Sequence, residues 1–176
     1  EFIIPGTSIA GIFFTTLKAV LGNSSIKENT ALWKKITLRN IMDDNPANAS
    51  YLAFRTATIQ SAETGVRDRV AIDNRWKTAK EKSKFSYWEI IPEKAYFIIF
   101  IEIDNISSGN RMNAVEVSLL KKWVEAVCYA WNKEGAVFGG FSSSGNGWSH
   151  LVKCSCLEIN RNNIKDYLNH SLADLY

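Results

Sequence analysis

The sequence has few cysteines and histidines, and this shortage excludes two kinds of site. The three cysteines, Cys128, Cys154 and Cys156, form no even set, which favours a reducing compartment over a disulfide framework. Together with His150 and His170 they complete no recognised zinc spacing. We therefore expect core cysteines, no metal and no other cofactor.

Long apolar runs and a strong net charge are also missing. No run reaches the roughly 18 residues that a membrane span needs, and the longest, residues 95–101 (AYFIIFI), has the length and composition of a strand. The first residues (EFIIPGTS) lack the basic region and cleavage site of a signal peptide. We expect a cytoplasmic protein with no membrane partner. Because the net charge is only +3, any basic surface must be local.

What is present indicates a folded domain. Hydrophobic residues make up 46% of the 176 residues, with six Trp, six Tyr and nine Phe, enough to build a core. The length fits one domain, residues 1–176. No internal repeat or low-complexity segment interrupts it.

Periodicity predicts the elements of an α+β fold. Thr7 or Ser8 can cap a helix whose apolar residues recur over 9–21 and which Gly22 ends. The other expected elements are a strand at 36–42, a strand at 95–103, a helix at 115–131, a final core strand at 148–159 and a tail helix within 160–176.

Adding a strand of which residues 2–4 would be the end gives the order βαββαβ, a ferredoxin-like (RRM-like) arrangement. Most of that first strand would lie outside the given chain. The core would then comprise residues 1–46 and 93–159. The long polar stretch 47–92 would form an excursion with local strands rather than core.

Two glycine-containing motifs could bind phosphate. Residues 4–11 (IPGTSIAG) join a strand end to a helix N-terminus with two hydroxyls, where free amides favour an anion; a plain capped helix is the alternative. Residues 139–148 (GGFSSSGNGW) contain four glycines and three serines, so their backbone can approach a ligand closely. This loop is no P-loop, and a simple connector is equally compatible with it.

Residues 67–84 concentrate the basic character of the chain. They hold seven Lys and Arg against three acids, with Trp76 among them and Phe85, Tyr87 and Trp88 nearby. Cations for phosphates and aromatic rings for base stacking suit single-stranded nucleic acid. The alternative is a solvated charge run.

Catalytic candidates are weaker. His150 follows the glycine loop and could act as a general base, but the sequence places no carboxylate partner beside it. A loop histidine without a catalytic role is the simpler interpretation. Asp43 and Asp44 precede a proline and indicate a turn.

In order along the chain, these motifs resemble the RAMP superfamily, specifically the backbone subunits of type III CRISPR effector complexes. Residues 5–11 (PGTSIAG) resemble the family's Pro-Gly-Ser-Ser-(Leu/Ile)-Lys-Gly motif, and residues 69–79 (RVAIDNRWKTA) resemble its Arg-(x)-(Val/Ile)-x-Ile-Asp-Arg-x-Thr-Gly-Thr-Ala segment. A strand after a proline turn follows at 91–97. Residues 139–147 (GGFSSSGNG) are similar to its last glycine loop.

The resemblance implies a palm that stacks into a filament on CRISPR guide RNA and an excursion that forms a thumb between guide and target RNA. Its implied partners are therefore guide RNA, target RNA and other RAMP effector subunits. The implied RNA-binding residues are Thr7, Ser8, Arg67, Arg69, Asn74, Arg75, Lys77, Lys80, Ser142, Ser143, Ser144, Gly145 and Asn146.

Two departures weaken the implied phosphate contacts. Ala10 stands where the motif has Lys, and Ser144 where the glycine loop usually has Arg. The family's RNA-cleaving aspartate lies upstream of the Pro-Gly motif, where this chain has only four residues. No catalytic residue is therefore assigned. A RAMP endoribonuclease, cutting through an upstream Asp or processing guides with His150, is the alternative function, and an RNA-free interaction module is a third.

Overall fold

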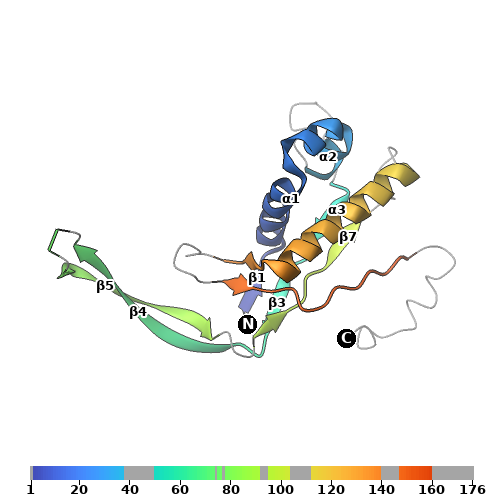
Figure 1. Ribbon diagram of the computed structural model, residues 1–176. Coiled ribbons are helices and arrows are strands. Elements are labelled where there is room, and N and C mark those ends of the chain that lie inside the picture. Colours follow the sequence, from blue (N-terminus) through green and yellow to red (C-terminus); the bar gives the residue numbers. More distant parts are fainter. Residues whose placement is uncertain are drawn as a thin grey trace, which may run out of the picture.

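The computed structural model describes residues 2–37, 50–73, 75–76, 78–91, 95–103, 112–139 and 147–159. Figure 1 shows a body of helices and short strands from which one long hairpin projects. The elements are β1 (Phe2–Ile4), α1 (Gly6–Glu28), α2 (Thr30–Thr37), β2 (Leu52–Phe54), β3 (Ala57–Gln60), β4 (Glu63–Asp73), β5 (Thr78–Ile91), β6 (Tyr96–Phe97), β7 (Ile101–Ile103), α3 (Ala114–Lys133), β8 (Ala136–Val137) and β9 (Trp148–Ser149).

The two long helices pack against each other and supply the centre of the core. Phe13 and Leu17 of α1 and Leu120 and Val127 of α3 are fully buried, because each helix repeats apolar residues on one face. The indole of Trp131 stands edge-on to the Phe13 ring, with centroids 6.3 Å apart. The helices predicted at 9–21 and 115–131 are thus confirmed.

Gly22 does not end the first helix as predicted but kinks it. Its φ of 69° and ψ of 169° are non-helical, and glycine reaches this region without a Cβ clash. Helical geometry resumes beyond it and continues to Glu28.

Short antiparallel sheets pack against the helices and contribute to the same core. One sheet has the order β1-β3-β6, and β2 pairs separately with β7. The strand predicted at 95–103 is therefore split, since Tyr96–Phe97 pairs with β3 and Ile101–Ile103 with β2. The chain is an α+β protein, as the sequence predicts. The more specific ferredoxin-like order remains a prediction.

The strand predicted at 36–42 is wrong at its start. Ile36 and Thr37 end the helix α2, and residues 38–42 lie outside the described part of the chain. Leu32 and Ile36 are buried one helical turn apart. Burial of this helical face outweighs the β-propensity of Ile and Thr.

Part of the predicted excursion belongs to the core. Tyr51, Leu52 and Ala57 are buried among the residues of the two helices. Leu52 and Ala57 lie in strands that pair with β7 and β1, and Tyr51 directly precedes β2. Only the hairpin formed by β4 and β5 projects from the body (Figure 1). The tail helix expected within 160–176 lies outside the described residues.

The final core strand predicted at 148–159 is wrong beyond residue 149. Only Trp148 and Ser149 pair, with β8, and the chain from His150 to Ile159 has no regular structure. Val152 is 92% exposed. Leu151 anchors this segment through its N–H, which donates to the Trp131 carbonyl at 3.2 Å.

Candidate nucleic-acid interface

The Pro-Gly motif opens α1, but its hydroxyls do not cap the helix. Pro5 occupies the N-cap, with no side-chain hydrogen bond there, so the predicted cap by Thr7 or Ser8 is wrong. Thr56, between β2 and β3, instead accepts the Gly6 N–H at 3.4 Å through its side-chain oxygen. Thr7 and Ser8 lie exposed in the first turn, where their hydroxyls can reach a ligand.

Gly6 brings this turn close to the strands. A Cβ at this position would lie 2.2 Å from the carbonyl oxygen of Phe54, far inside van der Waals contact. The glycine of the motif is therefore required for packing, and it fixes the helix N-terminus against the end of β2.

The glycine-serine loop starts and ends on the β8–β9 pair. Residues 140–146, which include Ser142, Ser143, Ser144, Gly145 and Asn146, lie outside the described part of the chain. At its end, Gly147 has a φ of 77° and accepts the Phe138 N–H at 2.8 Å. A Cβ on Gly147 would meet the Phe138 oxygen at 1.9 Å, so only glycine closes this loop.

A groove of about 320 Å³ runs between α1 and the ends of this loop. Its lining comes from Gly11, Ile12, Thr15, Thr16, Gly135, Ala136, Val137 and Trp148. Gly11 is the last residue of the Pro-Gly motif, and Trp148 directly follows the glycine loop. The structure thus brings two motifs that are more than a hundred residues apart to the two sides of one groove.

Ser8, Gly11 and Thr15 extend this surface along α1. All three are exposed, and the i, i+3, i+7 spacing places them on one helix face. Thr15 donates its hydroxyl to the Gly11 carbonyl at 2.8 Å. Hydroxyls and a glycine on one stripe allow a nucleic-acid backbone to approach the helix closely.

The basic segment forms most of the projecting hairpin. β4 and β5 pair antiparallel from Glu63↔Ile91 to Asp73↔Thr78. Alternation places Arg67 and Arg69 on one face. Arg67 forms a salt bridge with Glu89, with Nη2 and Oε1 2.7 Å apart, and Arg69 is half-buried. The cations of the hairpin base thus do not all face solvent, as a uniform basic strip would require.

The opposite face of the hairpin is mixed, because Asp68 and Ser86 lie on it next to one apolar pair. Val66 and Trp88 form a directly opposed cross-strand pair, and both are exposed, Trp88 to 71%. At the far end, the Arg75 guanidinium lies 5.3 Å from the centroid of the Trp76 ring. Asn74 and Lys77 are outside the described residues, and Lys80 is placed only as a position of β5.

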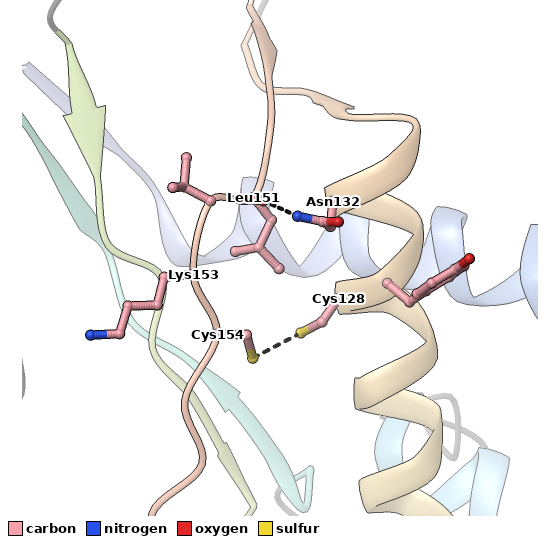
Figure 2. Close-up of a pocket in the computed structure, with 7 residues that line it drawn as sticks. Cys128, Asn132, Leu151, Lys153 and Cys154 are labelled. Carbon is pink, nitrogen blue, oxygen red and sulfur yellow. Dashed lines mark hydrogen bonds between the residues drawn. The ribbon is translucent and has the colours of Figure 1, made fainter.

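The cysteines depart from the expectation of a buried set. Cys154 and Cys156 are exposed. Figure 2 shows Cys154 pointing at Cys128 of α3, with the sulfurs 3.5 Å apart. Burial, together with the hydrogen bond from Cys154, raises the pKa of the Cys128 thiol to about 12. Cys128 therefore stays protonated at neutral pH and is a poor nucleophile.

His150 directly follows β9, just after the glycine-serine loop, and its Nε2 accepts the Trp148 indole N–H at 2.9 Å.

In the described residues, no three His, Cys, Asp or Glu side chains gather in a way that could hold a metal ion. None of the described helices combines the length and the apolar character of a membrane span.

The sequence did not predict that residues of α1 and of the glycine loop line one groove. Gly11 and Trp148 stood inside the quoted motifs, but Thr15 carried no motif signal. The usable signals were the aromatic residue directly after the glycine loop and the helical spacing from Ser8 to Thr15.

Comparison with known proteins adds one match. The family model described as the RAMP superfamily matches residues 1–153, which covers both sides of the groove and the whole hairpin. A search of curated protein sequences gave no significant match.

Proposed function

Because this chain belongs to the RAMP superfamily, we propose that it is a guide-RNA-binding backbone subunit of a type III CRISPR interference complex. Membership of the superfamily implies CRISPR-associated RNA binding. The finer assignment, to a backbone subunit that holds the guide and shapes the guide–target duplex, is the proposal.

The observation that carries it is the groove between α1 and the glycine loop. Gly11 and Trp148 lie on its two sides, and Thr7 and Ser8 are exposed one turn before Gly11. Backbone and hydroxyl groups of this kind position a phosphate chain without reading its sequence. In this proposal the guide backbone follows the α1 face, and Ser142–Asn146 of the loop also contact it.

The hairpin supplies the second contact. It extends away from the body (Figure 1) and carries the exposed Trp88 near its base, with Arg75 and the exposed Trp76 at its far end. A projecting element of this composition can reach a nucleic-acid duplex that lies along the body. Arg67, Arg69, Asn74, Arg75, Lys77 and Lys80 are the proposed contacts there, and Arg67 also forms a salt bridge with Glu89.

Charge neutralisation tests this arrangement. We expect Arg69→Gln, Arg75→Gln and Lys77→Gln together to weaken binding to unrelated single-stranded RNAs alike. The slope of log affinity against log salt concentration should flatten by about 0.7 for each phosphate that is no longer neutralised. The matched control replaces Lys27, Lys121 and Lys133 by Gln, which removes the same charge outside the hairpin and the groove. Equal losses in both variants would mean a general charge effect and would contradict the proposal.

Assembly is tested by native mass spectrometry of the protein co-expressed with its neighbouring genes. We expect complexes that contain RNA and other RAMP subunits. A stable RNA-free monomer as the sole species would exclude the backbone role. No proton transfer is assigned to His150, so His150→Ala should leave any RNA cleavage by the complex intact. Loss of cleavage with guide binding preserved would favour the endoribonuclease.

A further inference from the structure

Trp148 keeps a large aromatic surface in solvent at the edge of the groove. Its side chain is 58% exposed, although it belongs to a strand of the body. Exposed apolar area is unfavourable in water, and an aromatic ring beside a groove provides a surface on which another ring can stack.

The ring is held in place before any ligand arrives. Its indole N–H donates to His150 Nε2 at 2.9 Å, and the two rings meet edge-on. Gly135 has a φ of 77°, and a Cβ there would lie 2.9 Å from the Trp148 nitrogen. The polar atom of the indole is therefore already bonded, and the surface that remains is apolar.

The groove beside this ring suits a flat, uncharged group. Its lining includes no charged side chain among the described residues. A Cβ added to Gly11 would meet nothing within 4 Å, so the groove is open on the α1 side. The Thr15 hydroxyl donates to the Gly11 carbonyl and can still accept a hydrogen bond from the polar edge of a ligand. The Thr16 hydroxyl accepts the Trp131 indole N–H and can still donate one.

We propose that the groove takes one unstacked base of single-stranded RNA, which stacks on Trp148. This inference rests on the proposed function, because it assumes that RNA runs along α1. An aromatic surface bordered by hydroxyls matches a nucleobase, with its apolar faces and polar edges, better than it matches an aliphatic side chain of a partner. Stacking of this kind tolerates any base.

The test compares binding of the protein to fluorescently labelled oligouridine RNA and to an abasic ribose-phosphate oligomer of the same length. The variants are Trp148→Leu, which keeps apolar area but removes the aromatic ring, and Trp148→Phe, which keeps a ring. Tyr129→Leu is the control, because Tyr129 is exposed on α3 outside the groove.

We expect Trp148→Leu to weaken oligouridine binding by roughly 5- to 150-fold with an unchanged salt slope, since the protein still neutralises the same phosphates. Binding of the abasic oligomer should not change, and Trp148→Phe should retain most of the affinity. Oligouridine carrying 4-thiouridine should photocross-link to the peptide that contains Trp148.

Failure of the inference and failure of the proposed function give different results. If the unaltered protein binds RNA but Trp148→Leu binds it equally well, base stacking is excluded and the RNA-binding role stands. If Trp148→Leu keeps RNA affinity but loses subunit assembly in native mass spectrometry, the groove holds a partner side chain and the proposal is overturned. If the unaltered protein binds no RNA, both fail.

Discussion

The body of the chain and its β4–β5 hairpin are stabilised by different interactions. The body buries side chains from α1, α2, α3 and the short strands in one cluster. No described residue from Glu63 to Ile91 belongs to that cluster. The hairpin depends on its own ladder, the Arg67–Glu89 ion pair and the opposed Val66 and Trp88. An isolated two-stranded hairpin is marginally stable in water, so its order should depend more on a bound partner than that of the body.

The largest expected effect lies in the body. Phe13 is fully buried and its ring contacts those of Phe54 and Trp131. Phe13→Ala should lower the free energy of unfolding by about 3–5 kcal/mol, measured by urea denaturation. A loss below about 1 kcal/mol would show that the core is not centred on the α1–α3 contact.

Alanine substitution at the two glycines of the Pro-Gly motif should change the stability of the fold in opposite directions. Gly6→Ala puts a Cβ 2.2 Å from a backbone oxygen and should cost about 1–3 kcal/mol of stability. Gly11→Ala meets nothing and should add about 0.5–1 kcal/mol through helix propensity, while it narrows the groove and weakens RNA binding. Thermal unfolding and RNA titration of both variants check this pair; destabilisation by both would contradict it.

The contribution of the Lys35–Glu116 contact between α2 and α3 to the stability of the fold should depend on pH. The Lys35 ammonium donates to Glu116 at 2.7 Å and lowers the pKa of that carboxyl below its ordinary value of 4.5. Glu116 also accepts the Asn113 N–H, which completes a capping box. A lowered carboxyl pKa stabilises the fold above the unfolded-state value and loses this contribution as the pH falls through the folded-state value.

Glu116→Gln should therefore cost about 1–2 kcal/mol at pH 7. The difference from the unaltered protein should shrink as the pH falls below about 4.5. Urea denaturation across this pH range is the measurement. A difference that stays constant with pH would mean that the ion pair with Lys35 does not contribute.

The smallest effect on global stability should come from the hairpin. Trp88→Ser removes the cross-strand pair with Val66, worth about 0.2–1 kcal/mol. We expect faster amide hydrogen exchange in β4 and an unchanged urea midpoint. Binding of RNA to the unaltered protein should slow exchange in the hairpin more than in α1. A midpoint shift as large as that of Phe13→Ala would show that hairpin and body unfold as one unit.

The sequence predicts well what is set by local periodicity. The faces of α1 and α3 follow from apolar residues at helical spacing, and both helices are present. Local strands were expected within 47–92, but not that β2 and β3 would join the core, because each is at most four residues long and lies in a polar stretch. Their burial depends on pairing with β1, β6 and β7, which no local pattern records.

The candidate site was predicted in parts but not as an arrangement. The Pro-Gly motif and the glycine loop were identified, but their meeting across one groove depends on how α1 packs against α3. The cap by Thr7 or Ser8 was wrong because Thr56, distant in sequence, supplies the oxygen for Gly6. The salt bridge of Arg67 required the register of β4 and β5, which composition does not give.

The irregularity in the hairpin ladder has a consequence for how the chain tolerates insertions. Val70 pairs with Lys84 and Ile72 with Ala79, so one residue of β4 lies between these pairs against four of β5. Between the body and this bulge, adding one residue to either strand would turn every following side chain to the opposite face. At the bulge the strands are already unequal in length and the ladder is locally broken. Changes in length should therefore be absorbed there, so the far end of the hairpin can lengthen or shorten between relatives while the Val66–Trp88 face keeps its orientation.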